Sequence, residues 1–250
     1  MTTAAAIAIG DELLSGRTRD SNLHHLAGWL TERGVALREA RIVADDEAAI
    51  VAAIRALAPK HAYVFTCGGI GPTHDDITAD AVAKAFDAPI GENPDALKAL
   101  EDWYAARDED VTPARRRMAR TPEGARLIDN PESGAPGFQI QNVFVMAGVP
   151  RIFTAMLDGI DDRIERGARL CSFALTAEGL PESRLAEQLR ALQSALYGVT
   201  IGSYPFDGDV KGVTVVVRSE NEMLARQAAD GVAAAMRALG VEPVAGDHKG

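Results

Sequence analysis

Residues 62–88 read AYVFTCGGIGPTHDDITADAVAKAFDA, and this stretch decides the fold. Residues 62–66 form a short run of apolar and β-branched side chains, which predicts a buried strand. Residues 67–76 form a glycine-rich loop, and residues 78–88 predict a helix. A strand that passes through such a loop into a helix is one unit of an α/β fold, so we expect a parallel sheet.

The rest of the first half alternates strands and helices in the same way. Strands are predicted at 4–9 and 35–43, with helices at 21–34 and 46–57. Helices at 93–108 and 112–118, a loop at 130–138, a strand at 143–146 and a helix at 151–166 follow. We therefore expect a doubly wound, mostly parallel α/β sheet, with ligands bound where the strands end, in the loops after residues 9, 43 and 66.

The pattern changes near residue 168. A strand at 171–176, a helix at 181–196, strands at 199–204 and 212–217 and a helix at 221–239 are predicted. The order β-α-β-β-α indicates a small α+β domain. The expected domains are therefore residues 1–167 and 168–250.

Composition excludes several classes of protein. The 250 residues carry a net charge of −10, of which −8 lies before residue 167 (18 Lys and Arg against 26 Asp and Glu). Neither part has the basic excess of a nucleic-acid-binding protein, and an acidic surface by itself indicates only solvation.

Two cysteines, Cys67 and Cys171, favour a reducing compartment, and no apolar run approaches a transmembrane length. The short apolar run at 4–9 does not have the features of a signal peptide, so we expect a cytoplasmic protein without a membrane partner.

The glycine-rich loop has the chemistry of an anion site. Gly68, Gly69 and Gly71 let the backbone approach a ligand closely, and unpaired N–H groups there would bind phosphate. Thr73 and Thr78 could add hydroxyl donors. The acidic pair at 75–76 would repel phosphate unless a divalent cation intervened. The alternative is a tight turn in which one of these aspartates caps the next helix.

Charged clusters occur at the other strand ends. The groups at 10–12 and 45–47 follow the first two strands, and three acidic loops at one rim would require a metal or a cationic ligand. Asp45 alone could equally be a helix N-cap. This acidic domain also contains a cluster of arginines, the basic island: Arg115, Arg116, Arg117, Arg120 and Arg126. The basic island is either a solvated helix face or a source of one or two contacts to a ligand phosphate.

These motifs, in this order, resemble the CinA family (competence/damage-inducible protein A). The residues that carry the resemblance are 10–16 (GDELLSG), 20–22 (DSN), 68–73 (GGIGPT), 75–78 (DDIT), 133–138 (SGAPGF) and 148–150 (GVP). In this family a MoaB/Mog-type molybdopterin-binding domain is followed by a small KH-like domain, whose best match here is 203–205. The last segment has no G-x-x-G loop, so nucleic-acid binding is not expected.

The resemblance implies a site for a nucleotide or pterin with a pyrophosphate group. Relatives of the CinA type are associated with metal-dependent hydrolysis of ADP-ribose, related domains with FAD hydrolysis, and Mog-type relatives with molybdopterin. The two aspartates that matter in Mog-type enzymes fall on Asp45 and Asp76. The 250 residues leave no room for the amidase domain of full-length CinA proteins, so that activity is not expected.

The leading hypothesis is a metal-dependent nucleotide pyrophosphatase with Asp45 and Asp76 as catalytic residues. The alternative is a non-catalytic molybdopterin-binding module or a molybdenum-cofactor biosynthesis protein of the MoaB/Mog type. The metal, Mg²⁺, Mn²⁺ or Co²⁺, would be held by Asp11, Asp45, Asp75 and Asp76. We expect a small-molecule ligand and a homo-oligomer, with a dimer favoured and the small domain as a candidate for dimerisation. The predicted ligand-binding residues are Gly10, Asp11, Glu12, Gly68, Gly69, Gly71, Pro72, Thr73, Thr78, Ser133, Gly134, Ala135, Pro136, Gly137, Gly148 and Pro150.

Overall fold

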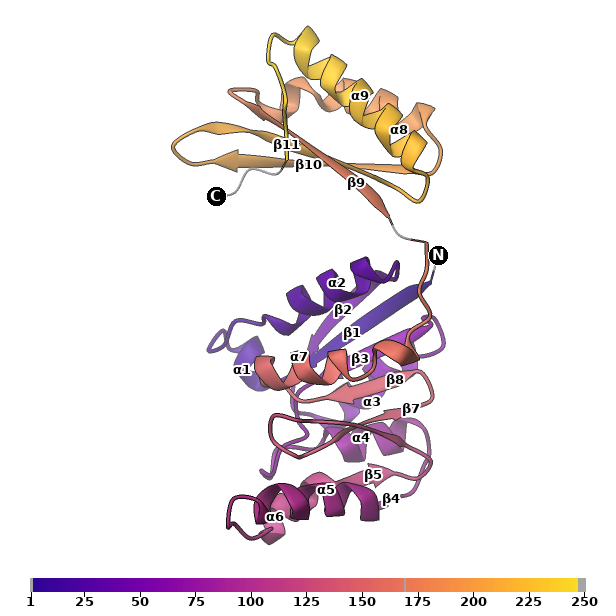
Figure 1. Ribbon diagram of the computed structural model, residues 1–250, viewed down its shortest axis with the longest axis vertical. Helices are drawn as coiled ribbons and strands as arrows, with labels where there is room; N and C mark the ends of the chain where they lie inside the picture. The colour runs from indigo at the N-terminus through magenta and orange to yellow at the C-terminus, as the bar shows by residue number, and fades with distance from the viewer. Residues whose placement is uncertain (1, 169, 247–250) are drawn as a thin grey trace. The chain divides into compact units, whose positions relative to one another are not determined.

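A six-stranded sheet organises the first of the two units into which the chain divides, Met1–Gly167 and Ala168–Gly250 (Figure 1). The computed structural model describes residues 2–168 and 170–246. The strand order is β2-β1-β3-β8-β7-β6, with bounds β1 Thr3–Ile9, β2 Ala36–Val43, β3 Tyr63–Cys67, β6 Arg126–Ile128, β7 Gly137–Ile140 and β8 Val143–Met146. Strands β2, β1, β3 and β8 are parallel, and β7 pairs antiparallel with both β8 and β6. The predicted mostly parallel sheet is confirmed.

Helices cover both faces of this sheet, as the doubly wound prediction requires. Helices α2 (Asn22–Glu32) and α7 (Pro150–Asp158) contribute to one core, and α3 (Glu47–Leu57) and α4 (Thr78–Ala85) to the other. Successive side chains of a strand point to opposite faces, so β1 supplies both cores. Ala4, Ala6 and Ala8 belong to the first, and Ala5, Ile7 and Ile9 to the second. This buried central strand holds the loop after Ile9 in place.

The remaining elements of unit 1 are the helix α5, of 12 residues, and several shorter segments. They are α1 Asp11–Leu14, α5 Pro94–Ala105, α6 Pro113–Arg116, the 3-10 turns η1 Arg117–Ala119 and η2 Asp161–Arg163, and the paired strands β4 Ile90–Glu92 and β5 Arg120–Pro122.

Two predictions were wrong in detail. The helix predicted at 151–166 ends at Asp158, because Gly159 caps it and the chain turns into η2. The loop predicted at 130–138 contains the start of β7, since strands of three or four residues show too little periodicity to be recognised.

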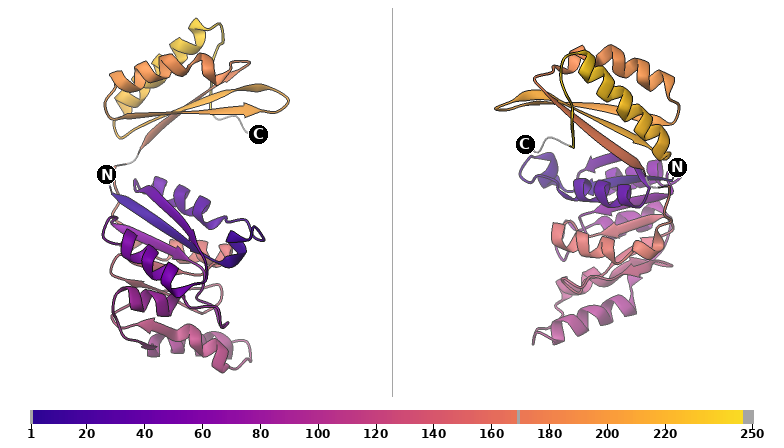
Figure 2. Two further views of the ribbon diagram at one scale, coloured as in Figure 1. Left: turned by 180° about the vertical axis from the view of Figure 1, so that it is seen from behind. Right: turned by 45° about the horizontal axis from the view of Figure 1, so that its top comes forward.

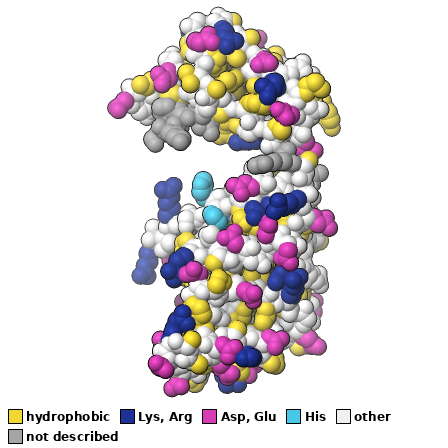
Figure 3. All heavy atoms as spheres, in the orientation of Figure 1, with side chains coloured by type: hydrophobic (Ala, Val, Ile, Leu, Met, Phe, Trp, Pro, Cys, Tyr) yellow, Lys and Arg dark blue, Asp and Glu magenta, His cyan; other side chains and the backbone are white. Residues whose placement is uncertain are grey.

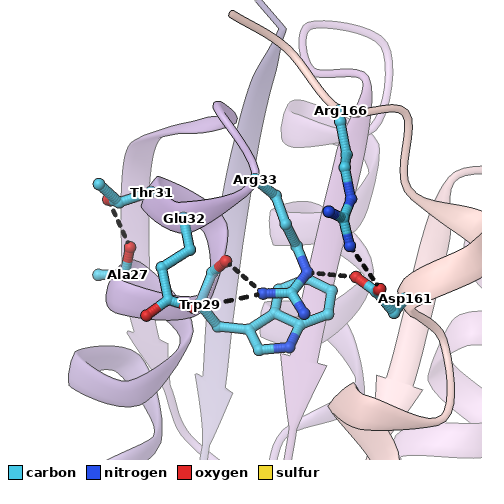
Figure 4. Close-up of polar contacts among 7 residues, drawn as sticks. All are labelled: Ala27, Trp29, Thr31, Glu32, Arg33, Asp161 and Arg166. Carbon is cyan, nitrogen blue, oxygen red and sulfur yellow. Dashed lines mark hydrogen bonds and ion pairs between the residues drawn. The ribbon is translucent and has the colours of Figure 1, made fainter. Parts of the chain in front are cut away.

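Unit 1 ends in a network of ion pairs around Asp161 (Figure 4). Its Oδ1 accepts a hydrogen bond from Arg33 Nε at 2.5 Å, and its Oδ2 accepts one from Arg166 Nη2 at 2.8 Å. The Arg33 guanidinium also stacks on the Trp29 ring, 3.7 Å from its centroid. The N–H of Gly167 donates to the carbonyl of Arg33 at 2.9 Å. The chain is therefore bonded to unit 1 up to the unit's last residue.

Unit 2 is a four-stranded sheet with both of its helices on one face (Figure 2). Its elements are β9 Cys171–Glu178, η3 Glu182–Arg184, α8 Ala186–Ala195, β10 Val199–Asp207, β11 Lys211–Ser219, α9 Glu222–Ala238 and β12 Val244–Ala245, and the strand order is β10-β11-β9-β12. Val213, Val215 and Val217 of β11 are fully buried in its core. The predicted small α+β fold is confirmed, and β12 adds a short edge strand to it.

On the face drawn in Figure 3, Lys and Arg side chains lie among Asp and Glu side chains.

Within the described ranges, no helix combines the length and the apolar composition that a bilayer span requires.

Candidate functional site

A cleft of about 570 Å³ opens in unit 1 where β1, β3 and β8 end. This is the edge at which parallel α/β sheets bind ligands, because the loops that follow the strands converge there. The loops after β1, β3 and β8 form one part of the wall, and α5, η1 and residues 130–135 form the other. The lining residues are Glu12, Thr18, Gly69, Ile70, Gly71, Pro72, Asp76, Tyr104, Met118, Asn130, Ser133, Ala135, Ala147, Gly148, Val149, Pro150 and Ile152.

The glycine loop between β3 and α4 approaches its neighbours too closely for side chains. A Cβ at Gly68 would lie 2.2 Å from the carbonyl oxygen of Ile9, and a Cβ at Gly69 would lie 2.2 Å from Thr78 Oγ1. Both glycines also have positive φ, 110° and 67°. A Cβ at Gly71 would lie 2.7 Å from Asp76 Oδ2. The loop therefore presents its backbone to the cleft.

Three consecutive backbone N–H groups of this loop have no hydrogen-bond acceptor among the described residues. Those of Gly69, Ile70 and Gly71 donate to no other residue that the structure describes, although all three residues line the cleft. Successive free N–H groups in a turn, beside the start of a helix, form a concave site for an anion. Helix α4 begins a few residues later, at Thr78. The arrangement has the chemistry of a phosphate-binding loop.

Polar side chains of the loop are engaged in holding it together. Thr78 is fully buried, and its hydroxyl donates to the carbonyl of Gly68 at 3.0 Å. Asp76 Oδ2 accepts the N–H of Thr73 at 2.8 Å and also the Thr73 hydroxyl. The hydroxyls of Thr73 and Thr78 are thus committed to the loop, and neither residue lines the cleft. Of the acidic pair, Asp76 lines the cleft while Asp75 does not.

Asp45 links the loops that follow β1 and β2. Its Oδ2 accepts the N–H of Asp11 at 3.0 Å, at the start of the short helix that carries Glu12. Burial raises the pKa of the Asp45 carboxyl, and the nearby carboxylates of Glu12, Asp11 and Asp75 raise it further, against the opposing hydrogen bond from Asp11. Asp45 lies behind the cleft wall, since its Oδ1 is 3.7 Å from the position of a Cβ at Gly69.

The four predicted metal ligands do not form a preformed metal centre. Within residues 2–168 and 170–246, no three His, Cys, Asp or Glu side chains are grouped closely enough to hold an ion. Asp75 is exposed and does not line the cleft. The carboxylates that line the cleft are those of Glu12 and Asp76. A metal at this site would need further oxygen ligands from a substrate or from water.

The predicted ligand-binding residues separate into a lining group and a supporting group. Glu12, Gly69, Gly71, Pro72, Ser133, Ala135, Gly148 and Pro150 line the cleft, and Pro136 lines an adjoining recess. Gly10, Asp11, Gly68, Thr73, Thr78, Gly134 and Gly137 line neither. Some of these support the wall by close packing. A Cβ at Gly134 would lie 2.3 Å from the Trp103 side chain, and one at Gly137 would lie 2.4 Å from the carbonyl of Val145.

Sequence reasoning missed the apolar side of the cleft. Tyr104 of α5 and Met118 of η1 line it, together with Ile70, Ala147, Val149 and Ile152, and the polar Thr18 and Asn130 also belong to the lining. The Arg115 guanidinium stacks on the Tyr104 ring, 3.9 Å from its centroid. Tyr104 lies in the helix predicted at 93–108, but nothing in that stretch of sequence indicated that it faces the glycine loop.

A second helix begins at the cleft. Pro150 is the first residue of α7, and Gly148 and Val149 before it also line the wall. Asn22 of α2 is buried, and its side-chain amide donates to the carbonyl of Gly148 at 2.7 Å. This hydrogen bond holds the loop between β8 and α7 in place. The start of α7 therefore borders the cleft, and its helix dipole favours a negative ligand there.

Comparison with known proteins covers both units. Residues 5–166 match the family model described as a probable molybdopterin binding domain, and residues 177–244 match that of the FAD synthase middle domain. A CinA-like protein of Desulfosudis oleivorans is 37% identical over 209 residues, which are 80% of this chain and 51% of the relative. The chain thus spans about half the length of that relative. A protein of Pyrobaculum calidifontis is 36% identical over 213 residues, 82% of this chain and 81% of the relative.

One solved structure supports the same relationship. It is that of the protein CinA, of unknown function, from Thermoplasma acidophilum. It aligns with a TM-score of 0.61 and 32% sequence identity, over 65% of this chain and 97% of its own.

Proposed function

The chain belongs to the family of CinA-like proteins with a probable molybdopterin binding domain, and from that premise we propose that it hydrolyses the diphosphate bond of a nucleotide with the help of a divalent metal ion. The observation that carries the proposal is the row of free N–H groups at Gly69, Ile70 and Gly71 in a cleft that also contains carboxylates. Free N–H groups suit phosphate oxygens. Carboxylates beside them suit a cation that arrives with the phosphate.

The donor set fits a metal that is shared with the substrate. Mg²⁺ is usually bound by one or two carboxylates, with phosphate oxygens and water completing its coordination. Glu12 and Asp76 supply two carboxylates to the cleft, and these are the residues that would hold the ion. A bound divalent ion supplies positive charge to the diphosphate and assists the activation of water.

The remaining residues have distinct roles in this proposal. The backbone at 69–71 binds the diphosphate, and the ring of the nucleotide occupies the apolar side beside Tyr104 and Met118. Asp45 does not line the cleft, so it is a positioning residue that holds the start of α1, and with it Glu12, through the N–H of Asp11. Water adds across the P–O–P bond, and each phosphorus leaves as a monophosphate.

Release of AMP tests the activity directly. ADP-ribose, FAD or NADH is incubated with the pure protein and Mg²⁺, Mn²⁺ or Co²⁺, and AMP is measured by chromatography. We expect Asp76→Asn to lower the rate at least a hundredfold, because it removes the carboxylate charge while the amide oxygen still accepts the N–H of Thr73. Asp75→Asn is the matched control, since Asp75 is exposed and lies outside the cleft wall. Near-normal turnover by Asp76→Asn would reject the assignment.

A second function is a non-catalytic molybdopterin-binding module. It is favoured by the description of the family model that matches residues 5–166 and by the apolar side of the cleft, which suits a planar pterin as well as a base. Fold likeness alone does not separate the two functions. No AMP with any of the three metals, together with tight pterin binding, would favour the module.

A further inference from the structure

The basic island of unit 1 is largely neutralised by acidic partners. Arg120 forms a bidentate ion pair with Asp80, with N···O distances of 3.0 and 2.7 Å. Arg116 forms a second pair with Glu92, which includes an N···O distance of 2.8 Å. These guanidinium groups have carboxylate partners, so a ligand would have to displace an acid to bind them.

The two outer arginines of the island are also engaged. Arg115 Nη2 lies 2.5 Å from Glu109 Oε2, while its guanidinium stacks on Tyr104. Arg126 lies 3.9 Å from Asp162 and lines neither the cleft nor the recess beside it.

Arg117 differs from these four. It begins η1 and is exposed, and its side chain makes no hydrogen bond or ion pair with any residue in the described ranges. It lines a recess whose other walls include Gly69, Gly71 and Asp76. These residues also line the main cleft. Arg117 therefore borders the glycine loop without an acidic partner.

The charges around the cleft indicate why an unpaired arginine at position 117 would matter for ligand binding. The glycine loop offers N–H dipoles but no full positive charge, and the lining carboxylates of Glu12 and Asp76 add negative charge. A diphosphate carries more negative charge than a monophosphate. Among the described residues that line the cleft or the recess, the other cation is Arg120, which Asp80 already neutralises.

We propose that Arg117 binds the second phosphate of the ligand and thereby selects a diphosphate over a monophosphate. A guanidinium group suits this task because its planar set of N–H donors bonds two phosphate oxygens at once, which a lysine ammonium does less well. No existing ion pair has to break for Arg117 to reach the ligand. The proposal rests on the proposed function only in that the cleft takes a phosphorylated ligand, and hydrolysis is not required.

Binding of a non-hydrolysable probe tests the proposal. Isothermal titration calorimetry would compare α,β-methylene-ADP with AMP for the wild type, Arg117→Gln and Arg117→Lys. We expect Arg117→Gln to weaken binding of the diphosphate analogue at least tenfold and that of AMP less than threefold, with Arg117→Lys in between. Arg116→Gln is the matched control, because that neighbour is also exposed but is paired with Glu92 and lines neither cavity.

The outcomes separate this proposal from the enzymatic one. If Arg117→Gln binds the analogue as the wild type does, if it loses both ligands equally, or if the wild type does not prefer the analogue, the selective role of Arg117 is overturned. If the analogue binds in an Arg117-dependent way but no substrate releases AMP, the role of Arg117 stands while the proposed hydrolysis fails.

Discussion

The two ends of the six-stranded sheet differ in how their polar groups are paired. At the end where the parallel strands begin, Asn142 donates to the carbonyls of Ala58 and His61 at 2.8 Å each, and the Tyr63 hydroxyl accepts the N–H of Glu165 at 2.9 Å. At the end where they finish, the N–H groups of 69–71 have no partner in the described chain.

This difference separates stability from binding within one domain. Paired polar groups at the first end fix the chain, and an unpaired group there would destabilise the fold. Unpaired groups at the second end are exposed to a cleft, where solvent or a ligand can satisfy them. Loss of a paired group at the first end should therefore lower the melting temperature without weakening ligand binding, and a change to the free N–H groups at the second end should weaken ligand binding. The following predictions test that separation.

The largest effect is expected from Gly69→Ala. The new Cβ would lie 2.2 Å from Thr78 Oγ1 at a φ of 67°, so the loop must shift and its N–H groups lose their common direction. We expect the affinity for α,β-methylene-ADP to fall at least tenfold, which corresponds to about 1.4 kcal/mol. Isothermal titration calorimetry measures this change.

Gly124→Ala is the matched control for the glycine loop. Gly124 also has a positive φ, 79°, but a Cβ there would meet no atom within 4 Å. The control carries the same kind of backbone strain without the close contact, so it should bind the probe as the wild type does. Unchanged binding by Gly69→Ala would show that the loop is not the anion site.

A smaller effect is expected from Asp161→Ala at the opposite end. The Arg33 side chain, which is only 13% exposed, would lose its shorter ion pair and keep only the one with Glu32, at 3.8 Å (Figure 4). We expect the melting temperature to fall by a few degrees while the affinity for the probe stays the same. Asp162→Ala is the control, because that neighbouring side chain is 73% exposed and its nearest cation is 3.9 Å away. Weakened probe binding by Asp161→Ala would contradict the separation of the two ends.

Of the three loops that the sequence pointed to, those after residues 9 and 66 line the cleft and the one after residue 43 does not. Strand ends and glycine loops have strong local signals. The run at 62–71 identified both the strand and the free backbone that follows it. The direction of a hydroxyl group has no such signal. Thr78 was a reasonable phosphate donor by spacing, yet it is buried and bonds Gly68. Tyr104 and Arg117 come from segments far along the chain, so only tertiary packing brings them to the loop.

The smallest effect concerns pH, and it should have opposite signs at the two ends. Hydrogen bonds from Arg33 and Arg166 hold the pKa of Asp161 below its usual range, so this stabilisation is complete above the ordinary aspartate pKa, about 3.9, and is lost as the pH falls through the lowered value. The decrease in melting temperature caused by Asp161→Ala should therefore shrink in acid.

Asp45 has the reverse dependence, because burial and the carboxylates of Glu12, Asp11 and Asp75 raise its pKa. Ionised Asp45 destabilises the fold, so wild-type stability relative to Asp45→Asn should fall as the pH rises from about 3.9 through the raised value. Asparagine keeps an oxygen to accept the N–H of Asp11. We expect Asp45→Asn to melt about 1–2 °C above the wild type at pH 7, with no advantage near pH 3.5. Thermal unfolding across this range in EDTA measures the difference, and an advantage that grew in acid would mean that the Asp45 carboxylate is stabilised rather than strained by its neighbours.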